Sequence, residues 1–347
     1  MYVCIVWFVG TVVYPSFQTS PSPISTAGHQ HCNHTSPCIH AFIHSFTRSH
    51  HSLISLPVKH DNNSPVLDTC LSPDGSTVFS CGVDKTVRMW QLAGAATATT
   101  IGVHDAPIKA VRFLERSNLI VTGGYDKKLK FWDTRSPNPV GVLDMPNRVY
   151  AMDAAGTSPW LVVGTADRQV ISYDVAQGQP RETLRKESPL KYQTRCLSVF
   201  PDGTGYAIGS IEGRVGIQYL QKVPGKDSFA FKCHRQDSNV YPVNGIAFHK
   251  PFGTFATVGS DGVVNFWDKD QKQRLKGFPA LERTISCATF HPAGNLFAYA
   301  SSYDWSKGSG HVQPGNEIYI HPVLEEEIRP KSKGSSSRSS GSGGFRR

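Results

Sequence analysis

The sequence predicts an all-β fold in which small sheets repeat around a ring, a β-propeller. Three observations favour this fold. First, an acid six residues ahead of a tryptophan recurs, in V-D-K-T-V-R-M-W (83–90), Y-D-K-K-L-K-F-W (125–132) and S-D-G-V-V-N-F-W (260–267). Second, apolar and polar residues alternate between the two, as they do in half-buried strands. Third, equivalent positions return every 41 to 49 residues between 90 and 267, which is the spacing of propeller blades.

Each unit starts with an apolar strand that runs into a tight turn. The turns contain proline followed by glycine, as in S-P-D-G (72–75), P-D-G (201–203), K-P-F-G (250–253) and H-P-A-G (291–294). Proline presets φ and glycine accepts a positive φ, so these stretches favour turns. A second strand then ends in small residues, and an acidic turn leads to a third strand. Six units are readable, of which the last and weakest ends at I-Y-I-H (318–321).

The acid-to-tryptophan spacing resembles the WD40 repeat, whose units carry a buried tetrad of hydrogen-bonded side chains. In the second unit this resemblance implies a tetrad of His104, Thr122, Asp126 and Trp132. The fourth unit departs from the pattern, because Glu212 and Gln218 stand where the acid and the aromatic residue are expected. His60 lies two residues further from its proline than His104 does. We therefore expect these two units to depend more on packing than on the tetrad.

Composition divides the chain into three parts. We predict a disordered, atypical N-terminal segment (1–52), a propeller (53–328) and a disordered, basic Gly/Ser-rich tail (329–347). The first fourteen residues are apolar and uncharged, but a membrane-spanning helix needs roughly 20 such residues, so no membrane insertion is expected. The stretch L-I-S-L-P-V-K (53–59) is a candidate outer strand for the last blade.

The positive charge of the chain lies mostly in the tail. Of the net charge of +9, residues 1–59 contribute +2 and residues 329–347 contribute +6, which leaves about +1 for the rest. The blades are nearly neutral, so we expect RNA binding by the isolated protein to be weak and non-specific. It would come from the tail or from a complex.

Chemistry at a metal or a catalytic centre is not expected. The eight cysteines form no C-x-x-C pair, and the spacing of Cys32 and Cys38 does not match a zinc finger. The sequence also lacks a G-x-S-x-G elbow, an H-E-x-x-H motif and a Gly-rich phosphate loop. We predict a non-enzymatic scaffold without metal or cofactor, in a reducing compartment.

Several stretches resemble one family, the messenger-RNA export factors of the nuclear pore. They include H-D-A-P-I-K (104–109), S-P-L-K-Y-Q-T-R-C (188–196), G-S-I-E-G-R-V (209–215), F-A-F-K-C-H-R (229–235) and A-Y-A-S-S-Y-D-W-S-K-G (298–308). The resemblance implies a seven-bladed WD40 propeller that binds the GLEBS segment of an FG nucleoporin, contacts RNA and supports messenger-RNA export. It also implies a location in the nucleus, at the nuclear envelope and pore, and in the cytoplasm. The related kinetochore checkpoint WD40 protein shares I-E-G-R-V and F-K-C-H-R. An adaptor that binds checkpoint kinases or mitotic spindle components is therefore the alternative.

The family resemblance also implies site residues. An acidic GLEBS hairpin would lie across one propeller face, where cations meet its carboxylates and aromatic side chains anchor it. The residues that carry over are Arg214, Phe231, Trp267, Asp268, Lys269, Lys272 and Arg274. In the inserted loop of the last unit, Asp304, Trp305 and Lys307 are further candidates for recognition.

Overall fold

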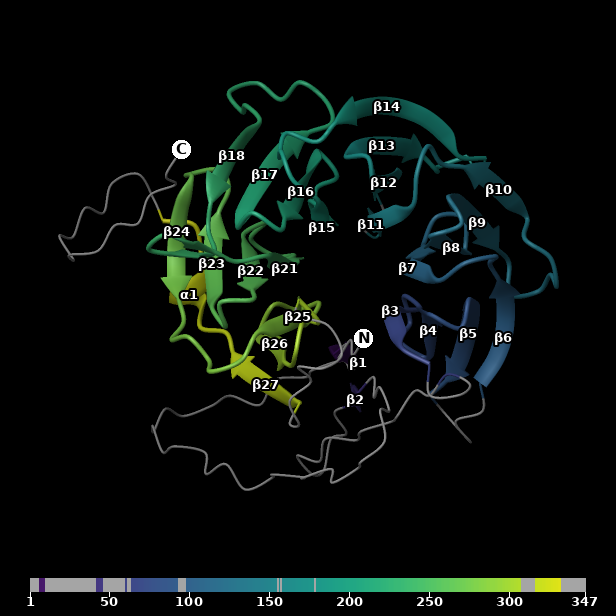
Figure 1. Cartoon of the computed structure of the whole chain (residues 1–347), viewed down its shortest axis with the longest axis horizontal. Helices are drawn as coiled ribbons and strands as arrows, with labels where there is room; N and C mark the ends of the chain where they lie inside the picture. The colour runs from purple at the N-terminus through teal and green to yellow at the C-terminus, as the bar shows by residue number, and fades with distance from the viewer. Residues whose placement is uncertain are drawn as a thin grey trace.

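Six antiparallel sheets stand around a central channel, as blades do in a propeller (Figure 1). The computed structural model describes residues 6–9, 42–45, 60, 64–92, 98–154, 156, 158–177, 179–306 and 316–331. Within these residues the fold is almost entirely β, with a single short helix, α1 (Glu325–Ile328). The prediction of an all-β propeller with six readable blades is confirmed.

Each of the first five sheets has four strands, ordered from the channel outward along the chain. Sheet 1 comprises β3 (Val66–Leu71), β4 (Thr77–Gly82), β5 (Thr86–Gln91) and β6 (Ala98–Val103); sheet 2 comprises β7 (Ile108–Leu114), β8 (Leu119–Gly124), β9 (Lys128–Trp132) and β10 (Gly141–Asp144). Sheet 3 comprises β11 (Val149–Ala154), β12 (Trp160–Thr165), β13 (Gln169–Asp174) and β14 (Arg181–Glu187). Sheet 4 comprises β15 (Thr194–Val199), β16 (Gly205–Ser210), β17 (Arg214–Tyr219) and β18 (Phe229–Lys232); sheet 5 comprises β21 (Val243–Phe248), β22 (Phe255–Gly259), β23 (Val264–Asp268) and β24 (Gln273–Gly277).

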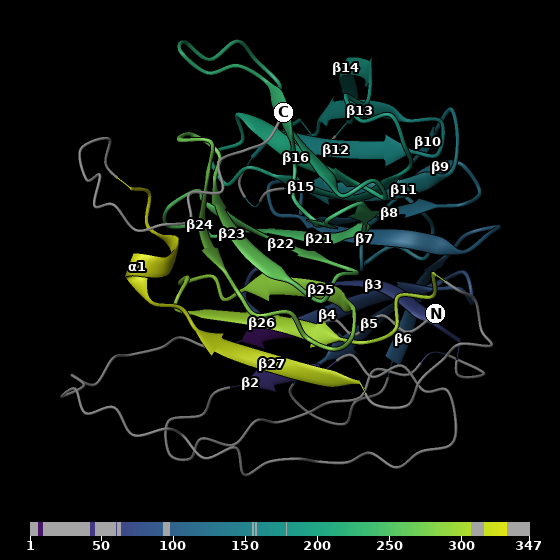
Figure 2. The same cartoon turned by 60° about the vertical axis from the view of Figure 1, so that its left-hand side comes forward.

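Sheet 6 differs because it has three strands in the described part of the chain, β25 (Ile285–Phe290), β26 (Leu296–Ser301) and β27 (Glu317–Pro322). Helix α1 follows β27 and lies beside β23 and β24 of sheet 5 (Figure 2). Two small pairs complete the strands: β19 (Arg235–Gln236) with β20 (Asn239–Val240), and the parallel pair β1 (Val6–Val9) with β2 (Phe42–Ser45). The candidate outer strand at 53–59 lies outside the described residues, as does most of the predicted terminal segments, whose boundaries stay predictions.

The turns follow the predicted chemistry. Gly75, Gly203, Gly253 and Gly294 have φ between 67° and 83°, the left-handed region that glycine tolerates best. In the acidic turns, the carboxylates of Asp84, Asp126 and Asp261 each accept the backbone N–H two residues later, at 3.2 Å. The short acidic side chain therefore closes the turn between the second and third strands.

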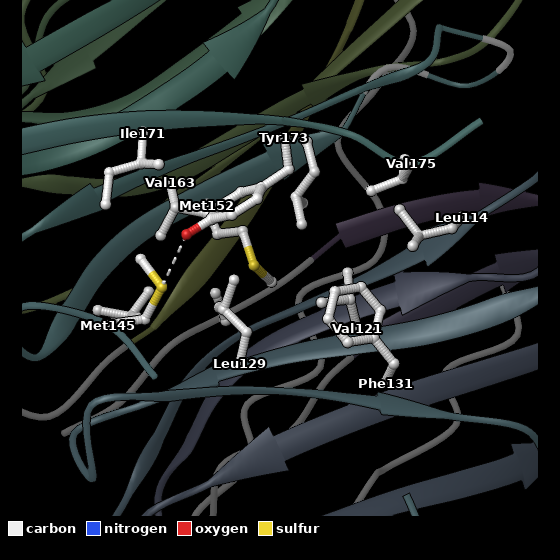
Figure 3. Close-up of a cluster of buried hydrophobic side chains, with 13 residues drawn as sticks. Leu114, Val121, Leu129, Phe131, Met145, Met152, Val163, Ile171, Tyr173 and Val175 are labelled. Atoms are coloured by element: carbon white, nitrogen blue, oxygen red, sulfur yellow. Dashed lines mark hydrogen bonds between the residues drawn. The ribbon is translucent and has the colours of Figure 1, made fainter. Parts of the chain in front are cut away.

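Each junction between consecutive sheets, from 1–2 to 5–6, is filled by one hydrophobic cluster drawn from both sheets. Figure 3 shows the cluster between sheets 2 and 3, where Phe131 and Leu129 of β9 lie beside Met152, Val163 and Ile171 of sheet 3. These shared clusters hold 8 to 13 buried residues each. Since a small twisted sheet cannot bury its faces alone, this packing between neighbours supplies the stability of the ring.

The tetrad predicted in sheet 2 is formed. The indole Nε1 of Trp132 donates to Thr122 Oγ1 (2.8 Å), and His104 lies between Thr122 (2.8 Å from Nε2) and Asp126 (2.9 Å from Nδ1). Burial lowers the pKa of His104, although Asp126 acts in the opposite direction. The imidazole is therefore neutral near pH 7, with the Nδ1 proton donated to the carboxylate and Nε2 free to accept the threonine hydroxyl.

The expectation for the first unit is wrong. Despite its irregular spacing, His60 reaches Asp84 (2.8 Å) and Ser80 (2.8 Å), and Trp90 donates to Ser80 (2.8 Å). The tetrad of sheet 1 is therefore formed. Sheet 5 carries a third tetrad, in which His234 contacts Asp261 (2.8 Å) and Thr257 (3.0 Å), and Trp267 donates to Thr257 (2.9 Å).

Candidate functional site

The predicted peptide-binding residues lie at opposite ends of the sheets. Arg214 begins β17, next to the acidic turn 211–213, whereas Trp267 and Asp268 end β23 and lead into the turn before β24. Since β17 and β23 are the third strands of neighbouring sheets, their starts lie on one face of the propeller and their ends on the other. We call the first the acidic-turn face. The seven residues thus occupy both ends of the sheets, and their contact with one peptide stays a prediction.

Four of these residues are also buried. Phe231 is 0% exposed and Trp267 is 4% exposed, with their ring centroids 4.8 Å apart in the core between sheets 4 and 5. Asp268 is buried and accepts the backbone N–H groups of Asp270 (2.8 Å) and Gln271 (3.1 Å). Lys269 is buried as well, with Nζ 5.1 Å from the ring centroid of Phe200 and 3.1 Å from Asp270. Phe231, Trp267 and Lys269 therefore pack between sheets 4 and 5, whereas Asp268 closes its own turn.

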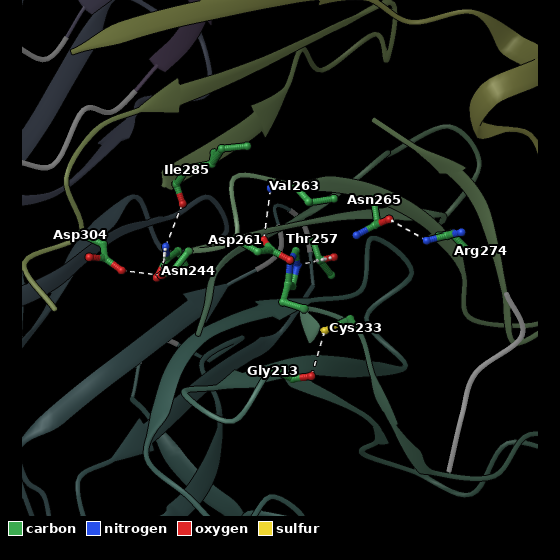
Figure 4. Close-up of polar contacts among 12 residues, drawn as sticks. Gly213, Cys233, Asn244, Thr257, Asp261, Val263, Asn265, Arg274, Ile285 and Asp304 are labelled. Atoms are coloured by element: carbon green, nitrogen blue, oxygen red, sulfur yellow. Dashed lines mark hydrogen bonds and ion pairs between the residues drawn. The ribbon is translucent and has the colours of Figure 1, made fainter. Parts of the chain in front are cut away.

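Lys272 and Arg274 are exposed on the opposite face. Lys272 Nζ lies 4.8 Å from the ring centroid of Phe229, and Arg274 Nη1 donates to Asn265 Oδ1 at 3.5 Å (Figure 4). Lys226 and Asp270 form an ion pair of 3.0 Å on this side of the molecule. The two predicted cations are thus accessible.

The candidate residues of the inserted loop also differ in how exposed they are. Asp304 is buried, and its carboxylate bonds Ser260 Oγ and accepts the N–H of Ser306 (3.1 Å), so it is not an exposed recognition residue. Figure 4 shows it beside Asn244, whose amide donates to Ser260 Oγ (3.0 Å) and to Ile285 O (2.9 Å). Trp305 is half-buried and lines the channel, where its predicted role is untested. Lys307 lies outside the described residues.

A cluster of cations surrounds one acid on the acidic-turn face. We define the Glu212 cluster as Arg168, Lys191, Glu212, Arg214 and Arg235. Arg214 Nε lies 3.7 Å from Glu212 Oε2, the N–H of Lys191 donates to Glu212 Oε1 (3.2 Å), and Arg235 Nη2 donates to the carbonyl of Glu212 (3.0 Å). Arg168 Nη1 donates to the carbonyl of Lys191 (2.5 Å). Two sheets and the connections on either side of sheet 4 thereby converge on one surface.

This surface has the composition of a site for an acidic peptide. Its four cations are opposed by two carboxylates, Glu212 and Glu187, the second of which pairs with Arg168. Tyr192, which follows Lys191 in the chain, is 57% exposed. A large aromatic surface within a positively charged patch suits a partner with carboxylates and apolar side chains.

Only Arg214 of this cluster was predicted. Arg168, Lys191 and Arg235 lie in three separate connections, and nothing in their spacing shows that these meet. The one sequence signal for them was the resemblance of S-P-L-K-Y and F-K-C-H-R to the export-factor family, which includes Lys191, Tyr192 and Arg235.

The channel is lined by the innermost strands of all six sheets. Its cavity has a volume of about 890 Å³. A β-bulge recurs near the start of each innermost strand, and the residues it displaces all line the cavity: Leu67, Lys109, Tyr150, Arg195, Asn244 and Ser286. Further along, Arg112 bridges Asp68 and Asp153 (2.5 and 2.7 Å). Arg112 thus pairs with an acid of each neighbouring sheet, which indicates a structural network.

The described part of the chain contains neither a cluster of metal-ligating side chains nor a membrane-spanning helix. No group of three or more His, Cys, Asp or Glu side chains there lies in an arrangement that could hold a metal ion. Cys32 and Cys38 lie outside it. Among the described residues, no helix is both long enough and apolar enough to cross a membrane.

Comparison with known proteins agrees with the repeats. The model of the WD domain, G-beta repeat, matches residues 51–91, 96–133 and 225–268; these are the three units that carry a complete tetrad. The chain is 43% identical to the Poly(A)+ RNA export protein of Schizosaccharomyces pombe, over 79% of this chain and 79% of that protein. It is 44% identical to Protein Rae1 of Drosophila melanogaster, over 77% of this chain and 80% of the relative. It is 48% identical to the mRNA export factor of Xenopus tropicalis, over 78% and 77%.

Proposed function

The chain belongs to the WD40-repeat family of messenger-RNA export factors, and from this premise we propose that it is a non-enzymatic scaffold in messenger-RNA export. It acts in the nucleus and at the nuclear pore, and shuttles to the cytoplasm. Its partner is the acidic GLEBS segment of an FG nucleoporin. The observation that carries the proposal is the Glu212 cluster, because it brings four cations together on one face, next to the exposed Tyr192 in the chain.

The geometry of the cluster suits an extended acidic segment. Arg214 is 29% exposed at its side chain and shares its one acid with backbone donors, so its guanidinium keeps N–H groups for a second carboxylate. The rigid ends of β17 and β14 fix the positions of the cations before the partner arrives, which lowers the entropy cost of binding. Binding there leaves the buried aromatic pair Phe231 and Trp267 undisturbed.

Reversing the charge of Arg214 should weaken the binding of the acidic partner segment. We expect Arg214→Glu to raise the Kd for a labelled GLEBS peptide of an FG nucleoporin at least about tenfold, or ~1.4 kcal/mol. Glu212→Gln should leave the affinity unchanged or increase it, because it removes a competing carboxylate. Fluorescence anisotropy at two salt concentrations measures both effects.

The matched control is Arg274→Glu, which makes the same charge change on the opposite face. It should alter the Kd by less than about twofold, as expected of a distant exposed charge. If Arg274→Glu weakened peptide binding and Arg214→Glu did not, the peptide-binding site would lie on the opposite face. Tighter binding of a checkpoint-kinase GLEBS peptide in the same assay would instead favour the mitotic adaptor.

RNA binding is a second part of the proposal and is assigned to the basic tail. A chain ending at Ile328 loses six cations and no acid, whereas the buried Ile328 itself is retained. We expect weaker binding of a single-stranded RNA oligonucleotide and a flatter dependence of log K on log salt, since each lost phosphate contact removes about 0.7 from the slope. An unchanged slope would contradict the assignment. The full chain, measured at the same salt concentrations, is the reference.

A further inference from the structure

The ring has one junction that its sheets do not fill. Among the described residues, the five shared clusters join consecutive sheets, but sheet 1 and sheet 6 each have a further cluster confined to one sheet. In sheet 1 it contains two buried residues, Val78 and Trp90, and in sheet 6 one, Ala298. These faces are those turned away from sheets 2 and 5. We call the space between them the open junction.

Both faces are apolar. Leu71, Leu92 and Ala98 extend the face of sheet 1, and Leu296, Ile318 and Ile320 extend the face of sheet 6; all six are only partly buried. At the five filled junctions the equivalent faces meet in clusters of at least 8 buried residues. A propeller sheet is stable only when neighbours cover its faces, so the open junction needs an additional occupant.

The structure places a strand pair of the same chain at this position. Strand β1 lies against β25 and β26 of sheet 6, and its parallel partner β2 lies beside it. Figures 1 and 2 both show the pair next to sheet 6, in purple. The sequence of β1, V-W-F-V, is wholly apolar, which suits contact with an apolar sheet face.

Chain connectivity ties this pair to the other side of the junction. The segment that carries β1 and β2 leads into His60, which is fixed to sheet 1 through Asp84 and Ser80. One end of the segment is therefore anchored on sheet 1 while β1 contacts sheet 6. Such tethering raises the effective concentration of the strands at the junction, relative to any separate molecule.

We propose that the N-terminal segment, through β1 and β2, takes the place of a seventh sheet and covers the open junction. It is an internal docking surface whose occupant is this chain itself. A second copy of the chain and a strand supplied by another protein are the competing occupants. The proposal is independent of the peptide-binding function.

The first test identifies the neighbour of β1 in the folded, full-length protein. With the photoreactive benzoylphenylalanine at position 8 in place of Phe8, irradiation should give an intramolecular crosslink to peptides within 285–301. Crosslinks to sheets 2 to 5 would overturn the proposal, as would a covalent dimer formed with residues 285–301 of a second copy. Mass spectrometry of mixed light and heavy protein distinguishes the two kinds of crosslink.

The second test removes the apolar character of β1. The double variant Trp7→Asp and Phe8→Asp should raise the amide exchange rates of β26 and β27 by about tenfold or more and leave β11–β13 unchanged, because only the sheets at the open junction lose their cover. Phe17→Asp, a substitution in the same segment outside β1 and β2, is the control and should have no effect. Unchanged exchange in β26 and β27 of the double variant would overturn the proposal.

Discussion

Replacing Phe231 with alanine should lower the free energy of unfolding by about 4 kcal/mol, the typical cost of emptying a buried phenylalanine site. The side chain is 0% exposed and lies among Trp267, Phe255 and the apolar strands of sheets 4 and 5. Its neighbours belong to two rigid sheets and cannot collapse into the space. Urea unfolding at 25 °C, followed by tryptophan fluorescence, measures the loss.

The same variant shows whether Phe231 is a core residue or an anchor for the bound peptide. In the cold, where Phe231→Ala remains folded, its Kd for the GLEBS peptide should equal that of the wild type. Phe229→Ala is the matched control, since Phe229 is half-buried two residues earlier on β18 and its loss should cost only about 1 to 2 kcal/mol. A Phe231→Ala variant with wild-type stability and lost peptide binding would show that the aromatic ring is an anchor after all.

The propeller itself could be predicted because its signals are local. Acidic turns, proline–glycine turns and alternating strands each depend on a few consecutive residues, so the six units and the tetrad at His104 follow from the sequence. The tetrad of sheet 5 was harder to see. His234 lies 27 residues before Asp261, compared with 22 in the His104–Asp126 pair, because β19 and β20 intervene.

The site could be predicted only in part, because it depends on which end of a strand a residue occupies. Family resemblance identified Arg214 and Lys272 as surface cations, but β17 and β23 place them on different faces. The burial of individual side chains was also difficult to predict from the sequence. Trp267 is one strand position from the exposed turn, yet its indole is committed to Thr257 inside the core. The Glu212 cluster unites four connections, and such convergence is a property of the closed fold.

The second large loss of stability is expected in the channel, where Arg112 lies between two acids. Arg112 of sheet 2 bridges Asp68 of sheet 1 and Asp153 of sheet 3, and those carboxylates also accept the backbone N–H groups of Val111 (3.0 Å) and Val199 (2.8 Å). Burial opposes the charge of Arg112, but the two carboxylates outweigh it and raise its pKa. One guanidinium therefore neutralises two acids and connects sheets 1 to 4.

Arg112→Met should destabilise the protein by about 3 kcal/mol at pH 7, because it leaves two carboxylates in the channel without their cation. Arg195→Met is the control in the same channel. Arg195 donates to Asn244 Oδ1 (3.2 Å) and to the carbonyl of Asp304 (3.3 Å), so its loss should cost only about 1 kcal/mol.

A triple variant determines whether charge or shape sets this cost. Asp68→Asn and Asp153→Asn keep an oxygen that accepts the N–H groups of Val111 and Val199, but they remove both negative charges. Combined with Arg112→Met, they should recover most of the lost stability, since a buried ion network can often be exchanged as a unit. If the triple variant unfolds as easily as Arg112→Met alone, the bridge acts through the packing of its methylene groups, and the electrostatic account of the channel is wrong.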